Sequence, residues 1–449
     1  MEDTIAAIST SLGIGAISII RVSGKDSIKI VNKIFRGKNL EEVSSHTINY
    51  GHIYENDKLL DEVLVMIMKA PKTFTTEDIV EINCHGGIST TNKILELLLL
   101  NGCRLAEKGE FTKRAFLNGR IDLEEAEGVM DLINSKTDKD RELALNQLSG
   151  KVSSLIKDLR EDLIQILSNI NVNIDFPEYD DVEEITIPLM KEKLENINKK
   201  ITKILEESKN GKIIKEGIKT SIIGKPNVGK SSLLNALIEE NKAIVTDIEG
   251  TTRDIVEGTL NINGILLNII DTAGIRKTDN VVEKIGVDKS LELINESDLI
   301  LYVLNNNEEL TDEDYNLFEQ IKNKNYIVII NKNDLEKKID DTKFDNIIYM
   351  SVKNNKGIDE LKEKIIELFN LEKIEKSDMN YVTSARSIAI LKQVKEKIDN
   401  LNKSILNNIS IDMLEIDIKE IWNLLGEIIG ETYEEELIDE LFKRFCLGK

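Results

Sequence analysis

The segment GKPNVGKS, residues 224–231, has the spacing of a phosphate-binding loop. The apolar run TSII precedes it and the helical pattern SLLNALI follows it, which is the strand–loop–helix context that such a loop needs. Its glycines let backbone N–H groups close around an anion at a helix N-terminus. Lys230 is expected to reach the β- and γ-phosphates as a catalytic group, and the Ser231 hydroxyl to bind Mg²⁺. The candidate contacts here are Asn227, Val228, Gly229, Lys230, Ser231 and Ser232.

A second motif, DTAG, ends an apolar run that follows the phosphate loop by about the length of one βαβ unit. Asp271 is placed for the magnesium shell, and the backbone N–H of Gly274 for the γ-phosphate. The alternative is an ordinary turn at the end of a strand. The distance of DTAG from the phosphate loop along the chain favours the nucleotide site. The candidate contacts are Asp271, Thr272, Ala273 and Gly274.

The third motif, NKND, follows the strand-like run YIVII. A carboxylate in the base pocket can accept hydrogen bonds from both the N1–H and the 2-amino group of guanine. Adenine lacks that pair of donors, so Asp334 predicts GTP rather than ATP. The later segment MSVKNNKG supplies a loop that closes over the base. The candidate contacts are Asn331, Lys332, Asp334, Ser351, Val352 and Lys353.

The water-orienting group differs from that of many small GTPases, in which a Gln follows DTAG. The residue at that position here is Ile275, whose apolar side chain cannot hold a water molecule. Hydrolysis therefore needs another group, and Glu283 in VVEKIG is the candidate. The alternative for Glu283 is a solvated glutamate at a helix start.

Asn227 is a second departure from the common loop sequence, and the segment TDIEGTTRD follows it along the chain. Its amide oxygen and nearby carbonyls could hold a monovalent cation beside the phosphates. Such a cation would supply the positive charge that an arginine finger gives elsewhere. The alternative is a turn-forming Asn after Pro226.

The order of apolar runs predicts four segments. Residues 1–118 mix β-like runs at 16–22, 63–68 and 79–83 with a helical run at 91–100, an α+β pattern. Residues 119–216 are helical, with a turn at IDFPEYDD. Residues 217–373 alternate strand and helix, with strands expected at 220–223, 266–270, 299–304, 327–330 and 347–350, which predicts a doubly wound α/β sheet. Residues 374–449 are helical again, so the sheet domain is inserted into one helical domain.

The last helical segment carries an apolar stripe that we interpret as core packing. Its members at helical spacing are Trp422, Leu425, Ile429, Leu437 and Leu441.

The net charge of −22 argues against extensive electrostatic binding of a nucleic-acid backbone by this chain. A more basic partner would have to bind the nucleic acid. No apolar run approaches the roughly 18 residues that span a bilayer. The N-terminus MEDTIAAIST is acidic where a signal peptide is basic, so a cytoplasmic protein is expected. Three cysteines without a CxxC spacing argue against a disulfide framework and a zinc finger.

At this point the sequence resembles the MnmE (TrmE) family of tRNA modification GTPases along its whole length. The motifs that carry the resemblance are GKPNVGKSSLLNAL, AIVTDIEGTTRD, DTAGIRK with VEKIG, EINCHGG, GEFTKRAFLNGRIDL, NIDFP and the terminal FCLGK. The terminal Cys-x-Gly-Lys ending is the most specific of them, because chain ends are usually frayed and unconstrained.

The resemblance implies a folate-binding N-terminal domain that homodimerises, and G domains that pair across their active sites with GTP and K⁺. It implies a heterotetramer with the flavin-dependent partner MnmG, so FAD enters only through that partner, which would hold most of the tRNA. The expected product is a carboxymethylaminomethyl or aminomethyl group on C5 of wobble uridine. Its one-carbon unit comes from a tetrahydrofolate derivative (5-formyl- or 5,10-methylene-).

The resemblance also assigns site residues, residue by residue. It implies a K⁺ site at Asn227, Thr251 and the carbonyls of Thr246 and Ile248, and Mg²⁺ ligands at Ser231 and Thr252. The remaining nucleotide contacts in that segment are Asp247, Glu249 and Gly250. Glu283 matches the residue that orients water.

The folate positions that the resemblance implies are Arg21, Glu81, Arg120 and Lys449. Position 120 is Arg where the family pattern has Lys, so a planar fork replaces a point charge. Cys446 is a candidate catalytic thiol, with a small buried thiol as the alternative. His85 in CHGG could act as an acid or base, with a structural His beside a Gly-Gly turn as the alternative.

Two other classes of GTPase share some of these motifs. A ribosome-assembly GTPase would have a basic RNA-binding appendage, which this acidic chain lacks. A membrane-remodelling GTPase would need a basic amphipathic face or a lipid anchor, and no membrane association is expected.

Overall fold

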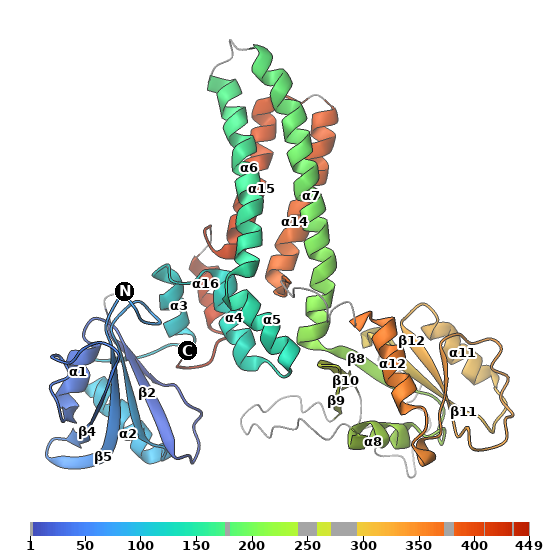
Figure 1. The fold of residues 1–449 in the computed structure, drawn as a ribbon, viewed down its shortest axis with the longest axis horizontal. Helices are drawn as coiled ribbons and strands as arrows, with labels where there is room; N and C mark the ends of the chain where they lie inside the picture. The colour runs from blue at the N-terminus through green and yellow to red at the C-terminus, as the bar shows by residue number, and fades with distance from the viewer. Residues whose placement is uncertain are drawn as a thin grey trace. The chain divides into compact units, whose positions relative to one another are not determined.

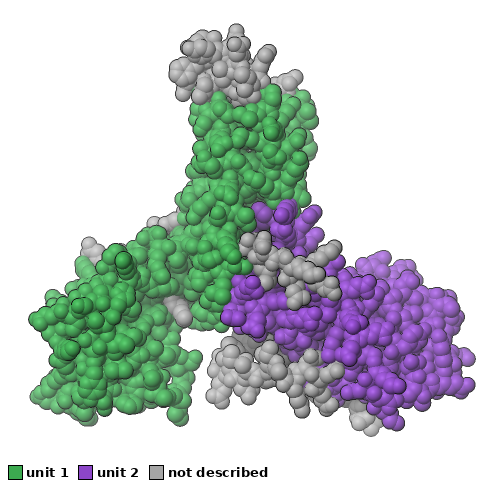
Figure 2. All heavy atoms as spheres, viewed as in Figure 1, with its two compact units in different colours: residues 1–134, 145–202, 384–449 green, residues 135–144, 203–383 purple. Residues whose placement is uncertain are grey.

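The computed structural model describes residues 3–175, 180–240, 258–270, 294–371, 381–407, 409–432 and 435–448. The chain divides into two units (Figure 2). Unit 1 comprises residues 1–134, 145–202 and 384–449, and unit 2 comprises residues 135–144 and 203–383. The polypeptide therefore leaves unit 1 and returns to it twice.

The N-terminal part of unit 1 is a seven-stranded sheet, in the order β3-β4-β5-β6-β2-β1-β7. The strands are β1 (Ile5–Ile8), β2 (Ile17–Ser23), β3 (Phe35–Arg36), β4 (Thr47–Glu55), β5 (Lys58–Met68), β6 (Ile79–His85) and β7 (Arg104–Leu105). All neighbouring pairs are antiparallel except β1 and β7. The expected runs at 16–22, 63–68, 79–83 and 91–100 are thus confirmed, the last as helix α2.

Strands β4 and β5 of this sheet are buried on one face, whereas β1 is buried on both. Ile82 and Cys84 of β6 lie in a core that also includes residues of α1 (Ser27–Ile34) and α2 (Ile88–Leu100). Alternate residues point to the opposite face of a strand, and there Ile17, Ile48 and Tyr50 are exposed. The sheet therefore has one covered face, and its second face is covered at β1, where Ile5 and Ala7 cluster with Phe111, but open and partly apolar at β4.

The rest of unit 1 is helical. Its helices are α3 (Glu110–Leu117), α4 (Leu123–Asn134), the end of α5 (Asp138–Leu148), α6 (Lys151–Asp175), the first part of α7 (Asp180–Glu216), α14 (Ala385–Leu406), α15 (Ile411–Ile429) and α16 (Glu435–Phe442). Figure 1 shows α6, α7, α14 and α15 side by side as a long bundle, in which Asn198 of α7 donates to Asp399 of α14 at 2.9 Å. The helices before and after the inserted sheet thus build one bundle.

The apolar stripe of the last helical segment is only partly buried. Leu425 and Ile429 are buried in the bundle, as expected. The prediction for Leu437 was wrong: its side chain is 41% exposed, and the adjacent Ile438 is buried instead. Helix α16 begins at Glu435 as a separate short helix, so its buried face does not continue the phase of α15.

Unit 2 contains a six-stranded sheet in the order β13-β12-β11-β8-β10-β9. Its strands are β8 (Ile218–Ile223), β9 (Thr259–Ile262), β10 (Ile265–Ile269), β11 (Leu299–Asn305), β12 (Tyr326–Asn331) and β13 (Ile347–Tyr349). All pairs are parallel except β9 and β10. The five expected strands are confirmed, and together with the bundle they confirm the predicted fold class.

The helical segments described in unit 2 are the start of α5 (Asp138–Leu148), the end of α7, α8 (Lys230–Glu240), α11 (Asp312–Ile321) and α12 (Ile358–Leu368). A short 3₁₀ helix, η1 (Val352–Asn354), follows β13. Strand β11 is buried at every position, as expected for a central strand of a parallel sheet covered on both faces.

Among the residues that the structure describes, no helix is both long enough and apolar enough to cross a membrane.

Candidate functional site

The phosphate loop lies where the strand order of the unit 2 sheet reverses. Strand β8 has β11 on one side and β10 on the other, and the loop follows its carboxyl end. Ligands of open α/β sheets bind in the crevice at such a point. The N-terminus of α8 begins at Lys230, so its free N–H groups and positive dipole end face the same crevice.

Two glycines of the loop allow close approaches between backbone and neighbouring groups. Gly224 has φ +144°, and a Cβ there would collide with the carbonyl oxygen of Val303. Gly229 has φ +104°, and a Cβ there would collide with the side-chain amide of Asn331. Both positions are therefore restricted to glycine by backbone conformation and by space.

Asn331 ties the phosphate loop to the base side of the site. Its Nδ2 donates to the carbonyl of Val228 at 2.9 Å, and its Oδ1 accepts the backbone N–H of Val352 at 3.3 Å. The side chain is buried at the end of β12. One amide thus fixes the relative positions of the phosphate loop, β12 and η1.

Lys230 folds over its own loop. Its Nζ donates to the carbonyls of Gly224 at 2.6 Å and Lys225 at 2.7 Å. Burial lowers the pKa of Lys230 because it disfavours the charged form. A phosphate in the crevice would offer this ammonium a counter-charge, in keeping with the role predicted from the sequence.

Asp334 lies beside Ser351 at the position expected for the base pocket. The Ser351 hydroxyl donates to Oδ1 of Asp334 at 2.6 Å and accepts from Nδ2 of Asn354 at 3.1 Å. This hydrogen bond holds the pKa of Asp334 below its usual value, so the carboxylate is ionised near neutral pH. Oδ2 is left as the acceptor oxygen that Ser351 does not engage. The structure thus brings Asn331, Asp334, Ser351 and Val352 together around one end of β12 and β13.

Asn227, Lys332 and Lys353 belong to the same loops. Asn227 is exposed with φ +64°, a left-handed conformation that Asn tolerates. Its side chain has no hydrogen-bond partner within the described parts of the chain. Lys332 also has positive φ, and Lys353 lies in η1.

Sequence reasoning missed an ion pair that supports the phosphate loop. Lys225 Nζ lies 2.5 Å from Oδ2 of Asp314 and also donates to the Thr311 hydroxyl. Thr311 and Asp314 form the capping box at the start of α11. The T-x-x-D spacing could have predicted the cap, although nothing local indicates that it holds Lys225.

Several predicted site residues lie outside the described parts of the chain. They are Thr246, Asp247, Ile248, Glu249, Gly250, Thr251, Thr252, Asp271, Thr272, Ala273, Gly274, Glu283 and Lys449.

A second polar site lies on two central strands of the N-terminal sheet, around Arg21 and Glu81. These residues face each other on β2 and β6, and their side chains form an ion pair at 2.8 Å. Arg21 Nη1 also donates to the carbonyl of Gly448 at 3.3 Å, and the Ser9 hydroxyl donates to the same oxygen at 3.2 Å. The structure therefore brings two of the predicted folate residues next to the residue that precedes Lys449.

Close packing fixes the C-terminal segment in this place. The backbone N–H of Gly109 donates to the carbonyl of Cys446 at 3.2 Å. A Cβ on Gly448, whose φ is +85°, would collide with the carbonyl oxygen of Ile8. A Cβ on Gly109 would lie 2.7 Å from the Cβ of Phe445. The described end of the chain is thus packed against the sheet, with the Cys446 side chain exposed.

Arg120, the fourth folate candidate, shares an aromatic support with Arg21. Its guanidinium lies over the ring of Phe74 at 4.9 Å and donates to the carbonyl of Phe74 at 2.7 Å. Phe74 packs against the cluster that contains Phe111, and Arg21 lies over the ring of Phe111 at 5.6 Å. Both cations therefore rest on one group of apolar side chains.

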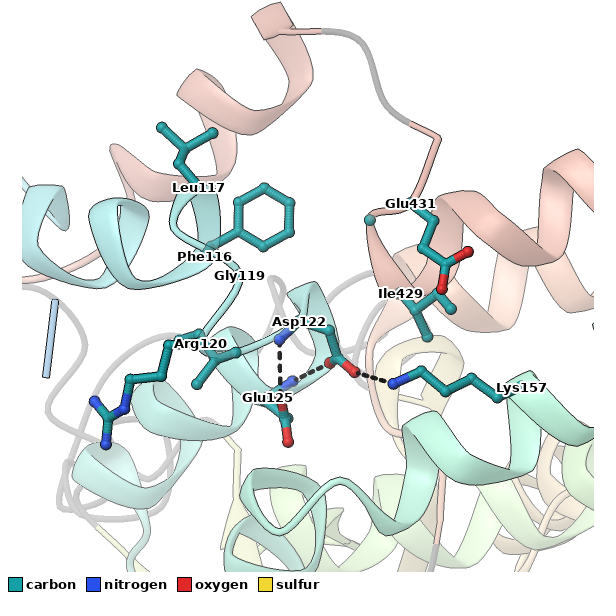
Figure 3. Close-up of a pocket in the computed structure, with 11 residues that line it drawn as sticks. Phe116, Leu117, Gly119, Arg120, Asp122, Glu125, Lys157, Ile429 and Glu431 are labelled. Atoms are coloured by element: carbon teal, nitrogen blue, oxygen red, sulfur yellow. Dashed lines mark hydrogen bonds and ion pairs between the residues drawn. The ribbon is translucent and has the colours of Figure 1, made fainter. Parts of the chain in front are cut away.

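Arg120 also borders a pocket of about 370 Å³ (Figure 3). Asp122 lies in this pocket with Lys157, whose Nζ is 3.4 Å from Oδ2 of Asp122. The backbone N–H of Asp122 donates to Glu125 at 2.8 Å. Figure 3 shows Arg120 directed away from these groups, so its guanidinium is not taken up by the ion pair.

The N-terminal domain also contains His85 and two buried cysteines, Cys84 and Cys103. Nδ1 of His85 lies 2.6 Å from Oδ1 of Asp61, which raises the pKa of His85 by stabilising the imidazolium. Burial raises the pKa of the Cys103 thiol to about 12 and also raises that of Cys84. These two thiols are inert packing groups at neutral pH.

The phosphate loop at the switch point of a parallel sheet, followed by an Asp334–Ser351 pair at the base side, defines a P-loop GTPase domain inserted in a helical protein. The model of the MnmE helical domain matches residues 123–446, and the model of the GTP-binding protein TrmE N-terminus matches residues 4–120. The chain belongs to the MnmE family of tRNA modification GTPases, and it is a GTP hydrolase.

Individual relatives agree with this family along their full length. Two proteins called tRNA modification GTPase MnmE, from Bacillus cytotoxicus and Bacillus mycoides, are each 54% identical over 100% of this chain and 99% of their own. Among solved structures, the G domain of the T. maritima FeoB iron transporter is 27% identical. It covers 34% of this chain and 98% of its own, with a TM-score of 0.24.

Proposed function

We propose that this GTPase is stimulated by K⁺ and acts in the cytoplasm with the flavin-dependent partner MnmG. Together they add a carboxymethylaminomethyl or aminomethyl group to C5 of wobble uridine in tRNA. The one-carbon unit comes from a tetrahydrofolate derivative, and FAD enters only through the partner. Because this chain carries a net charge of −22, the partner holds most of the tRNA backbone.

One observation carries this proposal: the C-terminal segment packs beside Arg21 and Glu81. The Gly448 carbonyl accepts hydrogen bonds from Arg21 and Ser9, so the attachment point of Lys449 lies beside a central strand of the N-terminal sheet. A frayed chain end would make none of these contacts. The docked end and the ion pair therefore support a single site built from both ends of the chain.

The chemistry of this donor set fits a folate. A carboxylate such as Glu81 can accept hydrogen bonds from the ring N–H and amino groups of a pterin. Arg21, Arg120 and Lys449 offer cations for the anionic glutamyl tail, and Phe74 and Phe111 supply an apolar support. When bound, the folate supplies a one-carbon unit at the oxidation level of formaldehyde or formate. The chain's own residues bind and orient it.

Substitution of Arg21 should weaken folate binding selectively. In Arg21→Ala both the ion pair to Glu81 and the hydrogen bond to Gly448 are lost, so we expect at least tenfold weaker binding of 5-formyltetrahydrofolate by titration calorimetry. Arg36→Ala is the matched control, because Arg36 is an exposed arginine of the same sheet that stacks on Tyr54 at 4.1 Å. If the Arg21 variant and the control bind 5-formyltetrahydrofolate with equal affinity, the assignment of the folate to this site is wrong.

In the nucleotide site we assign the phosphates to the loop 224–231 and the base to Asp334. Lys230 exchanges its two carbonyl partners for phosphate oxygens. Ser231 and Thr252 would hold Mg²⁺, which neutralises charge on the phosphates. We assign Asp271 to the Mg²⁺ shell, the backbone N–H of Gly274 to the γ-phosphate, and the other loop candidates to nucleotide contacts. Glu283 orients the attacking water.

GTP hydrolysis should be several-fold faster in KCl than in NaCl at equal ionic strength. Asn227 is exposed in the phosphate loop. We assign its amide oxygen to the K⁺ site, together with Thr251 and the carbonyls of Thr246 and Ile248. Asn227→Ala should abolish the difference between the salts, whereas Asn235→Ala on the exposed face of α8 should keep it. Steady-state phosphate release measures both. Equal rates of the wild type in the two salts would rule the site out.

Replacing Glu283 should slow hydrolysis without loss of nucleotide binding. A group that orients water acts mainly in the transition state, and such groups contribute on the order of a hundredfold. Glu283→Ala should therefore reduce turnover about a hundredfold and change GTP affinity by less than about threefold. Glu296→Ala, at an exposed glutamate, is the control. If single-turnover hydrolysis by the Glu283 variant matches the wild type, Glu283 is a surface residue.

The open face of the N-terminal sheet suits a second copy of this chain. Ile17, Ile48, Tyr50 and Leu64 are 46–65% exposed there, and such apolar surface commonly marks a protein interface. We therefore assign the homodimer contact to this face.

A further inference from the structure

Asn306 lies immediately after β11, the strand that is placed between β8 and β12 in the sheet of unit 2. Its side chain is buried, with 1% of its surface exposed. Its backbone N–H donates to the carbonyl of Asn331 at 2.9 Å, so the pairing of β11 with β12 continues past the last residue of β11. The other hydrogen bonds that the structure describes for Asn306 go to the loop that follows β12.

That loop, residues 332–339, carries Asp334 and forms no helix or strand. Nδ2 of Asn306 donates to the carbonyl of Leu335 at 3.1 Å. The backbone carbonyl of Asn306 accepts the N–H groups of Lys338 at 2.8 Å and Ile339 at 3.3 Å. A single buried residue after β11 therefore holds the loop at two places, directly after Asp334 and again at the end of the loop.

Asn307 holds the same loop at the next residue. Its Nδ2 donates to the carbonyl of Glu336 at 2.8 Å. Its backbone N–H donates to Oδ1 of Asn305 at 3.1 Å, which fixes the course of the chain at this point. The carbonyls of two consecutive loop residues, Leu335 and Glu336, are thus bound by two consecutive asparagines. We name Asn306 and Asn307 the asparagine clamp.

The chain before Asp334 is held from the other neighbouring strand. The backbone N–H of Asn333 donates to the carbonyl of Met350, directly after β13, at 3.0 Å. The Ser351 hydroxyl donates to Oδ1 of Asp334 at 2.6 Å. The clamp binds Leu335, the residue after Asp334. The ends of β11 and β13 together therefore fix the backbone on both sides of this carboxylate.

The proposed recognition of guanine depends on where this carboxylate is held. Two protons of the base, N1–H and one of the 2-amino group, must both reach Asp334. Hydrogen bonds weaken steeply when their distance or angle departs from the ideal values, and a recognition group has to be held to within about 0.5 Å. Hypoxanthine keeps the N1–H but lacks the 2-amino group. The preference for GDP over IDP therefore measures how well the second hydrogen bond forms.

We propose that the asparagine clamp is a positioning element that determines guanine specificity. It holds the loop so that the Asp334 carboxylate meets both protons of the base, and it acts through Asp334 rather than by contact with the nucleotide. The role of the clamp rests on the assignment of the base to Asp334 in the proposed function. If the clamp served stability alone, its loss would lower the melting temperature and leave the preference for guanine unchanged.

Two variants open the clamp to different degrees. Asn306→Asp keeps the size of the side chain but places a carboxylate oxygen against the Leu335 carbonyl, where a donor is needed. Asn307→Ala removes only the donor to the Glu336 carbonyl, at a residue that is half-buried. The second variant is the milder one, because it introduces no buried charge.

Two controls change the same sheet away from the clamp. Ile300→Val removes one methylene group from the buried start of β11, so it lowers stability without touching the clamp. Asn325→Ala removes a side-chain hydrogen bond of the same kind, from Nδ2 to the carbonyl of Asp298 at 3.3 Å, next to the start of β12. Both lie at the amino ends of the strands, opposite the ends that carry the nucleotide site.

The experiment uses the full-length chain and separates binding from turnover. Displacement of a fluorescent GDP analogue measures the affinities for GDP and IDP, and phosphate release at saturating GTP measures kcat. Thermal melts of every variant verify folding. We expect the wild type to prefer GDP over IDP by at least about tenfold.

Opening the clamp should reduce this preference. Asn306→Asp should weaken GDP binding by at least about fivefold and IDP binding by less than about twofold. Asn307→Ala should lower the preference in the same direction by about two- to threefold. The kcat at saturating GTP should stay within about twofold, because the clamp acts on the base and not on the phosphates. Ile300→Val and Asn325→Ala should keep the wild-type preference.

A wild-type preference for GDP in both clamp variants would overturn the proposal, whatever their melting temperatures. If Asn306→Asp does not fold, Asn307→Ala alone decides in the same way. Equal affinity of the wild type for GDP and IDP would refute the base assignment to Asp334 and the role of the clamp together. A preference that Asp334→Asn abolishes but both clamp variants retain would keep the base assignment and reject the clamp alone.

Discussion

Asp334→Asn should convert the protein from a GTP-binding into a xanthosine triphosphate-binding form. In the proposed base pocket Asp334 accepts the N1–H and 2-amino protons of guanine, and the Asn amide presents a donor where the 2-amino group needs an acceptor. Hydrogen bonds to charged groups contribute about 1.5–3 kcal/mol each, so GTP binding should weaken by at least about a hundredfold. Xanthine carries an oxygen at that position, which accepts from the Asn amide.

The geometry around Asp334 makes this substitution conservative for the fold. The Ser351 hydroxyl donates to Oδ1 at 2.6 Å, and an Asn side chain keeps that oxygen. The oxygen that Ser351 does not engage becomes the NH₂ group. Asp340→Asn is the control, since Asp340 is an exposed aspartate in the following loop that is bonded to Thr342. Direct competition between the two nucleotides measures the effect, and an unchanged preference for GTP would refute the base-pocket assignment.

Deletion of residues 446–449 should abolish tRNA modification while GTP hydrolysis persists. The deletion removes the Gly448 carbonyl that Arg21 and Ser9 bind, the Cys446 thiol and the Lys449 ammonium. The predicted nucleotide contacts all lie in other segments of the chain, and the last of them is Lys353. We therefore expect modification below a tenth of the wild-type level and GTP turnover within about twofold, since only the proposed folate site is affected.

Misfolding is the main alternative explanation for a loss of modification. The deletion also removes the Cys446 carbonyl that Gly109 binds, but Phe445 remains in its buried cluster. A thermal melt of the truncated protein separates the two explanations, because misfolding should lower GTP hydrolysis as well. A folded, truncated protein that modifies tRNA normally would exclude the terminal motif from the active site.

The sequence predicts the sheet of unit 2 well because its buried parallel strands are continuous apolar runs. Strands β8, β11 and β12 each bury nearly every side chain, so their pattern differs clearly from the surrounding helices. Strand β9, with only four residues in TLNI, gave too short a pattern to detect. In the N-terminal sheet β4 was missed, because its open face carries residues such as Tyr50 and its sequence lacks a continuous apolar run.

The candidate sites were predictable where a motif lies within one loop. Lys230, Asp334 and Ser351 each follow a strand, and their residue types within the motifs predict their roles. Contacts between distant segments have no such local pattern: Asn331 bonds to Val228, and Ser387 to Glu124. In the run LEEAEG, Glu124 resembles any solvated glutamate in the first turn of a helix, and only the packing of α4 against α14 and α5 buries it.

Nucleoside analysis of tRNA tests most directly whether this GTPase serves the C5 modification of wobble uridine. Total tRNA is digested and separated by liquid chromatography with mass detection, from cells that lack this gene and from cells that carry it again. We expect carboxymethylaminomethyl- and aminomethyl-type uridines to disappear in the first sample, with C5-unsubstituted uridines in their place, and to return in the second. Identical nucleoside profiles in the two samples would contradict it.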